Sequence, residues 1–188
     1  MLAGEDVVLT RAAPTLTLTR LQSGTGSLRV RLVASEAVGD ILLGCAYELS
    51  DGTSLVQRVR GPQTAPPDGH RPVIRASRDT GEVITFDLVQ VRRLSRMVVY
   101  AYSASGQPVH WGGTLTIEML AGTRVRLPLD RVTGASGAGV LVPLSIYNVD
   151  GELVLRHEGV IVEGSLRTVA LAFGFDRITW VDDHTPLV

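Results

Sequence analysis

Residues 40–52 read DILLGCAYELSDG, and this stretch limits the kinds of fold open to the chain. The run Ile41–Leu49 is almost wholly apolar, which is typical of a strand buried in a core. Asp51 and Gly52 follow it closely, and an Asp-Gly pair beside an apolar run indicates a tight hairpin turn. A partner strand is then expected over Leu55–Val59. The stretch therefore predicts a hairpin whose first strand is buried. The alternative, suggested by its opening residue Asp40, is that the stretch is what remains of a cation site.

A second stretch has the same pattern of residues. Ser145–Gly159 (SIYNVDGELVLRHEG) aligns with Ala46–Gly61 (AYELSDGTSLVQRVRG) when the two Asp-Gly pairs are superposed. Both read as a strand, a tight turn and a second strand. Two hairpins of one kind account for this likeness, and an internal duplication is the alternative.

Segments in which apolar and polar residues alternate indicate strands with one face in water. Ser27–Val33 reads SLRVRLV, so Arg29 and Arg31 point away from the apolar residues between them. Thr15–Leu21 reads TLTLTRL and separates leucines from threonines in the same way. Such alternation is typical of a strand with one face on a core and one in water. The two arginines are interpreted as a solvated strand face, with an anion-binding patch as the alternative.

Short segments of this kind continue along the chain between turn residues. No long segment has the 3.6-residue period of a helix, and Asp87–Arg96 (DLVQVRRLSR) is interpreted as a connection between strands. The pattern predicts an all-β sandwich or barrel with little or no helix, in one domain over residues 1–188. Further strands are expected at Val73–Ala76, Val83–Asp87, Met97–Ser103, Thr114–Leu120, Arg124–Leu129, Val140–Asn148, Glu152–Arg156, Arg167–Phe173 and Ile178–Val181.

The composition is that of an ordinary globular protein. The chain has 188 residues, of which 45% are hydrophobic and 20% charged, and its formal net charge is −1. So small a net charge gives no reason to expect nucleic acid or an anionic membrane as a partner. All 18 basic residues are arginine. Because lysine is absent, a Walker-type phosphate loop and Schiff-base chemistry are both excluded.

The expected location is the cytoplasm. Cys45 is the only cysteine, so neither an intrachain disulfide nor a cysteine-based zinc cluster can form. The N-terminal residues MLAGEDVVLT lack the charged and apolar regions of a signal peptide. No apolar run has the length of a membrane-spanning helix, and no membrane insertion is expected.

Several motifs occur along the chain in a recognisable order. Gly4–Leu21 (GEDVVLTRAAPTLTLTRL) reads as a strand, a proline-containing turn and an alternating strand. After DILLGCAYELSDG come PPDG at Pro66–Gly69, SRDTGEVITFDLVQV at Ser77–Val91 and FGFDRITWVDD at Phe173–Asp183. This order resembles TerD-like proteins, the tellurite-resistance and stress-response family. Trp111–Val140 departs most from the family's spacing, which indicates a divergent, TerA-like member.

The resemblance implies a fold and a role. TerD-like proteins are two-sheet β-sandwiches that hold calcium between loops at one end and have no enzymatic activity. They act in bacterial responses to tellurite and other stresses through assemblies with proteins of the same operon. By resemblance, the chain is expected to be a binding or scaffold protein whose partners are other TerD-like or operon-encoded proteins, or further copies of itself.

The resemblance places a calcium site at Asp40, Asp79 and Glu82. In the family the strand that enters the site reads Asp-x-Asp-x-Ser. Here only Asp40 keeps its oxygen, because Leu42 and Gly44 stand at the other two positions. Calcium takes about six to eight oxygen ligands. The site is therefore interpreted as degenerate: we expect calcium binding to be weak or absent and expect no other cofactor.

Two functions of other classes stay open. Trp111 lies in an HWGG turn and suits a carbohydrate- or ligand-binding β-sandwich. A small metal-dependent hydrolase is the other alternative, built around His157, His184 and the aspartates Asp182 and Asp183. None of the histidines has the HxH or HExxH spacing of a zinc site, so this second alternative depends on the fold bringing distant residues together.

Overall fold

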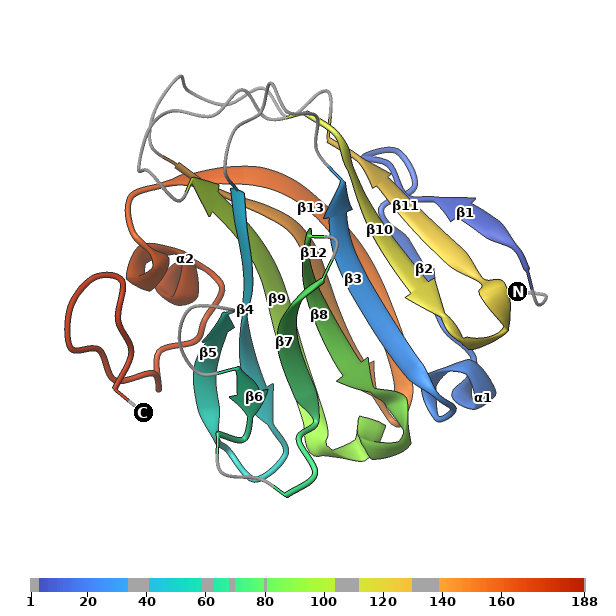
Figure 1. Ribbon diagram of the computed structural model, residues 1–188, viewed down its shortest axis with the longest axis horizontal. Coiled ribbons are helices and arrows are strands. Elements are labelled where there is room, and N and C mark those ends of the chain that lie inside the picture. The colour runs from blue at the N-terminus through green and yellow to red at the C-terminus, as the bar shows by residue number, and fades with distance from the viewer. Residues whose placement is uncertain are drawn as a thin grey trace.

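Two β-sheets pack face to face in the computed structural model of the protein (Figure 1). The structure describes residues 4–33, 41–58, 63–67, 70–79, 81–103, 112–129 and 139–187. Strands make up most of these residues, and the helical segments are short. The expected all-β, two-sheet sandwich is confirmed.

The first sheet, sheet A, has the strand order β1-β11-β10-β3-β8-β7-β6. Its strands pair antiparallel, except that β1 and β11 run parallel. Alternate residues of its central strands, such as Val30 on β3 and Ile84 on β8, lie in the core between the sheets. The bounds are β1 (Asp6–Val8), β11 (Arg124–Pro128), β10 (Thr114–Met119), β3 (Ser27–Val33), β8 (Gly81–Asp87), β7 (Ile74–Asp79) and β6 (Thr64–Ala65).

The second sheet, sheet B, has the order β2-β13-β12-β9-β4-β5. The two predicted Asp-Gly hairpins, β4–β5 and β12–β13, lie on opposite sides of β9. Asp150 and Gly151 both have positive φ, 53° and 88°, as a type I′ hairpin turn requires. The bounds are β2 (Thr15–Thr17), β13 (Glu152–Glu163), β12 (Gly139–Val149), β9 (Leu94–Ser103), β4 (Ile41–Leu49) and β5 (Ser54–Arg58).

The strand expected over Arg167–Phe173 is wrong, because this segment forms the helix α2 (Leu166–Ala172). Ser165 Oγ accepts a hydrogen bond from the Thr168 backbone N–H at 3.2 Å, and Thr168 Oγ1 accepts one from the Ser165 N–H at 3.4 Å. This capping box satisfies N–H groups that begin a helix. The apolar residues recur at helical spacing and pack on sheet B, which favours a helix over a strand.

The strand expected over Ile178–Val181 is also wrong. This region runs as an irregular segment over sheet B, with a single β-bridge between Trp180 and Pro186. The strand expected over Thr15–Leu21 ends at Thr17, because Thr19 caps a short helix. The remaining short helices are α1 (Arg20–Ser23), η2 (Leu88–Arg93) within the predicted connection, and η3 (Leu120–Gly122). Each helix in the described ranges is too short to cross a bilayer.

Sheet B is covered on both faces around β4, β9 and β12. Leu43, Cys45 and Tyr47 of β4 point into the core between the sheets. Ala46 points the other way, into a second apolar layer that α2 and the C-terminal segment close. Phe175 and Ile178 of that segment are buried there. The second layer explains why β4 is apolar on both faces.

Arg96 on β9 holds the C-terminal segment against the sheet. Its Nη1 and Nη2 donate to the carbonyl oxygens of Phe173 and Gly174 at 3.1 and 2.6 Å, just after α2. Its Nε donates to Glu48 on β4 at 2.8 Å. The guanidinium carbon also lies 4.5 Å from the centre of the Phe175 ring, a cation–π contact. One arginine therefore ties α2, the segment after it and two strands together.

Gly44 is required by close packing in the second layer. A Cβ atom at Gly44 would lie 2.5 Å from Cε2 of Tyr100, whose ring is buried between β9 and α2. We predict that Gly44→Ala lowers the free energy of unfolding by about 2 kcal/mol, the usual cost of overpacking a core. Urea unfolding followed by circular dichroism measures this cost.

Gly112→Ala is the matched control, because a Cβ there has no neighbour within 4 Å. In a Tyr100→Leu background the cost of Gly44→Ala should shrink, since the clashing ring is gone. An equal cost in both backgrounds would contradict this explanation.

Candidate functional site

Glu82 links the two sheets at the end where the cation site was predicted. It is 8% exposed, at the start of β8 in sheet A. Its Oε2 accepts a hydrogen bond from the backbone N–H of Leu43 on β4 in sheet B. Asp79 is the last residue of β7, the strand next to β8, but the structure does not describe the Asp79 side chain. Asp40 lies wholly outside the described residues. The calcium set therefore stays a prediction.

Leu42 and Gly44, the two positions at which the TerD-like pattern would place further ligand oxygens, point away from Glu82. Gly44 faces Tyr100 in the layer under α2, and Leu42 shares its face of β4 by the alternation of a strand. Glu82 shares its face of β8 with Ile84 and Phe86, which lie in the core between the sheets. In this fold the carboxylate of Glu82 has a structural role, since it joins β8 to β4.

We predict that calcium binds weakly or not at all. Metal-stripped protein titrated with calcium chloride in a calorimeter should give no saturable heat at micromolar concentrations, because Leu42 and Gly44 supply no ligand oxygen. The control is Glu82→Gln, which should not change the titration. Micromolar binding that Glu82→Gln abolishes would contradict the prediction and support a working site.

His157 is buried at the edge of the core, beside the N-terminal segment. It is 7% exposed on β13, and its backbone N–H donates to the Pro14 carbonyl at 2.7 Å. Its ring lies over Gly159, whose φ of 57° and lack of a side chain leave it room. Arg11 Nη2 donates to the Gly159 carbonyl at 3.2 Å. Burial lowers the pKa of His157, and the charge of Arg11 lowers it further, whereas Glu158 opposes the shift.

We predict that this histidine makes the protein less stable as the pH falls. In the unfolded chain the imidazole takes up a proton near its ordinary pKa of 6.5, whereas the folded state resists protonation to lower pH. Below pH 6.5 the unfolded state therefore binds more protons, and the free energy of unfolding decreases. In His157→Gln the decrease between pH 7.5 and 5 should be smaller than in wild type. Urea unfolding across this range measures the difference, and an unchanged slope would contradict it.

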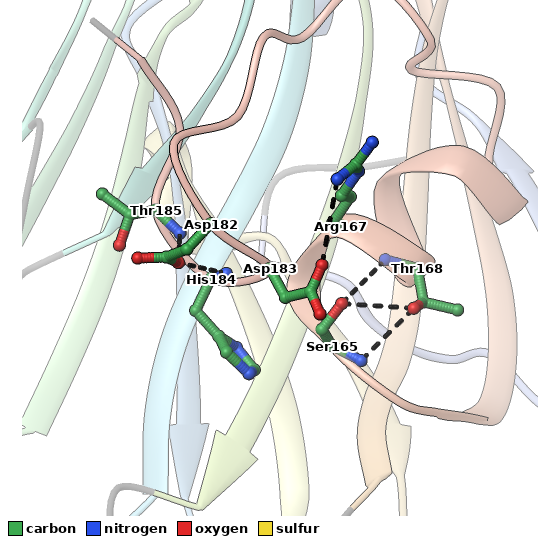
Figure 2. Close-up of polar contacts among 7 residues, drawn as sticks. All are labelled: Ser165, Arg167, Thr168, Asp182, Asp183, His184 and Thr185. Carbon is green, nitrogen blue, oxygen red and sulfur yellow. Dashed lines mark hydrogen bonds and ion pairs between the residues drawn. The ribbon is translucent and has the colours of Figure 1, made fainter.

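The C-terminal residues of the hydrolase alternative are engaged in local contacts (Figure 2). Asp182 Oδ1 accepts from the backbone N–H groups of His184 and Thr185 at 2.7 and 2.8 Å. Asp183 Oδ1 lies 3.9 Å from Nη1 of Arg167 on α2. These contacts form a turn and attach it to the helix (Figure 2).

The two histidines of that alternative lie on different faces of sheet B. His157 follows Leu153 and Leu155 on the face toward sheet A, whereas His184 belongs to the segment over the opposite face. In the described part of the chain, no group of three or more His, Cys, Asp and Glu side chains is placed to hold a metal ion. Trp111, on which the carbohydrate alternative depends, lies outside the described residues.

A pocket of about 350 Å³ lies on the outer face of sheet A, the face away from sheet B. Ser27, Arg75 and Thr85 line it from three neighbouring strands, β3, β7 and β8. His70 and Arg71, from the segment before β7, also line it. This pocket could not be predicted from the sequence, because its residues come together only when the three strands pair.

Hydrogen bonds fix one wall of this pocket. Asp87 Oδ1 accepts from the Val89 N–H at 3.1 Å, and Asp87 Oδ2 accepts from Gln90 Nε2 at 2.8 Å. Gln90 Nε2 also donates to the Pro72 carbonyl at 3.1 Å. Arg93 Nη1 donates to Gln90 Oε1 at 2.8 Å and to the Arg71 carbonyl at 3.3 Å. These contacts bind η2 to the segment that carries His70 and Arg71.

Unpaired arginines extend from the pocket along the outer face. Thr85 is the register partner of Arg29 on β3 and of Arg75 on β7, so the three residues form one row across the strands. Both arginines are exposed, and neither forms an ion pair with a residue in the described ranges. On β10 and β11 the charges are paired: Arg126 lies 2.8 Å from Asp6, and Glu118, the register partner of Arg29 on β10, lies 3.3 Å from Arg124. The alternation of arginines in Ser27–Val33 was the one signal of this surface in the sequence.

Comparison with known proteins gives no matching family model and no significant match to a curated protein. The resemblance to TerD-like proteins therefore stays a prediction that depends on the order of motifs in this chain. Function has to be argued from the geometry of the two faces of the sandwich.

Proposed function

We propose that the protein is a non-enzymatic, TerD-like binding or scaffold component of a bacterial stress response. Its partners are operon-encoded proteins with acidic surfaces, and its contact surface is the outer face of sheet A around Arg29. A cytoplasmic location belongs to the proposal, and the single, buried free thiol of Cys45 is compatible with a reducing compartment.

The difference between the two sheets carries this proposal. The part of sheet B around β4, β9 and β12 is covered on both faces, whereas no helix crosses the front of β10, β3 and β8 in Figure 1. Arg29 and Arg75 are exposed on that surface, and neither forms an ion pair in the described part of the protein, where Glu118 beside Arg29 pairs with Arg124 instead. A surface of this kind favours encounter with an acidic partner and sets its orientation.

The sheet edges are less suited to such contacts. Of the four edge strands, β1, β2 and β6 span only Asp6–Val8, Thr15–Thr17 and Thr64–Ala65, and β5 has five residues. Short edge strands present few free backbone groups and so limit pairing with another chain. The face of sheet A, rather than an edge, is therefore the contact surface in the proposal.

The arrangement of ionisable groups also supports a non-enzymatic role. His157 and His184 belong to different faces of sheet B, so they do not form one constellation. Asp182 and Asp183 are engaged by backbone N–H groups and by Arg167. General acid–base or nucleophilic catalysis needs such groups within hydrogen-bond reach of each other or of one substrate.

We predict that the tagged chain copurifies with proteins encoded beside its gene when they are expressed together. Arg29→Glu should abolish copurification, because it reverses the charge at the centre of the basic surface. Arg167→Glu is the control, because it makes the same reversal of charge on α2, which packs on sheet B. The ion pair that it removes, with Asp183, is long and exposed and contributes little to stability. The readout is the ratio of partner to tagged chain after size-exclusion chromatography.

Two outcomes would contradict the proposal. One is wild-type protein that elutes as an isolated chain from every coexpression. The other is copurification that Arg29→Glu and Arg167→Glu weaken equally, since this would place the contact elsewhere. A homo-oligomer that Arg29→Glu dissociates would also contradict it, because the partner would then be the chain itself.

A further inference from the structure

We propose that the pocket on sheet A is a binding site for a small phosphorylated ligand. This inference goes beyond the proposed protein contacts. Arg75 belongs to both surfaces, but the inference concerns the pocket and not the open strand face around Arg29. The pocket volume, about 350 Å³, falls within the range of small-molecule sites.

The hydrogen-bond donors of the pocket come from three directions. Arg75 projects from β7, and the hydroxyl groups of Ser27 and Thr85 come from β3 and β8. Arg71 and His70 approach from the segment before β7. A phosphoryl group accepts hydrogen bonds through several oxygens in a tetrahedral arrangement, and arginine matches two of them at once. A planar carboxylate offers acceptors in one plane only, and so uses fewer of these donors.

The charges in the pocket favour an anion. Arg75 and Arg71 stand against one carboxylate, that of Asp87. Both oxygens of Asp87 already accept hydrogen bonds, from the Val89 N–H and the Gln90 amide. Arg75 has no ion-pair partner among the described residues, so its guanidinium is available to a ligand. Arg93, behind Gln90, adds a further positive charge nearby.

The wall of the pocket is already ordered before a ligand arrives. Gln90 and Arg93 hold the Pro72 and Arg71 carbonyls, and the Asp87 N–H donates to the Val73 carbonyl at 2.8 Å. The backbone that carries Arg71 is therefore fixed to the end of β8 and to η2. Such preorganisation lowers the entropy cost of binding.

The experiment is a calorimetric titration of the full chain at constant ionic strength and pH 7.5. The probes are inorganic phosphate, glycerol phosphate and acetate. We expect saturable binding of phosphate and glycerol phosphate, and none of acetate at the same concentrations. Arg75→Ala should weaken phosphate binding roughly tenfold or more, the usual effect of losing a charge-assisted arginine–phosphate contact.

Two variants make the test specific. Arg75→Lys keeps the charge but loses the planar fork, so its phosphate affinity should lie between those of wild type and Arg75→Ala. Arg92→Ala removes an exposed charge from η2 that does not line the pocket. It should bind phosphate as wild type does. Thermal unfolding of each variant shows that the fold is retained.

Three results would overturn the inference. These are the absence of saturable phosphate binding, acetate binding as tight as phosphate binding, and equal weakening by Arg75→Ala and Arg92→Ala. The last result would mean that phosphate responds only to net charge. Failure of this test leaves the Arg29 contact surface unaffected, since the two experiments use different residues and different probes.

Discussion

The apolar character of β9 on both faces is the constraint on which the rest of the structure depends. Met97 and Val99 point toward sheet A, whereas Val98 and Tyr100 point toward α2. A strand of this kind loses the free energy of burial on one side unless a further layer covers it. The C-terminal chain supplies that layer, and Arg96 fixes it in place by bonding the carbonyls that follow α2.

The same constraint separates the roles of the two sheets. The C-terminal segment covers sheet B around β4, β9 and β12, whereas polar strand residues such as Arg29 and Arg75 are exposed on the outer face of sheet A. Charges that would be costly in the layer under α2 are well solvated there. Arg29 and Arg75 are therefore exposed on sheet A, the second apolar layer belongs to sheet B, and the pocket lies where β3, β8 and β7 meet η2.

The predicted cation end of the sandwich has a structural use in this chain. Glu82 spans the two sheets by accepting the Leu43 N–H, and Tyr100 occupies the space that a side chain at position 44 would need. The departures from the TerD-like pattern at Leu42 and Gly44 are thus consistent with the packing around them. An apolar layer under α2 replaces polar side chains on that face of β4.

Local sequence determined the strands and hairpins, because alternation and Asp-Gly turns act over a few residues. The hairpins around Gly52 and Gly151 could be predicted for this reason. The helix α2 was not predicted, since Val169, Leu171 and Phe173 alternate as in a strand, and the helical spacing of the buried residues is used only where sheet B requires a cover. The candidate site could be predicted only as far as Arg29 and Arg31, which alternate within one strand. Pairing of β3, β8 and β7 brings Ser27, Thr85 and Arg75 into one pocket, and only the tertiary structure decides contacts between residues so far apart in the chain.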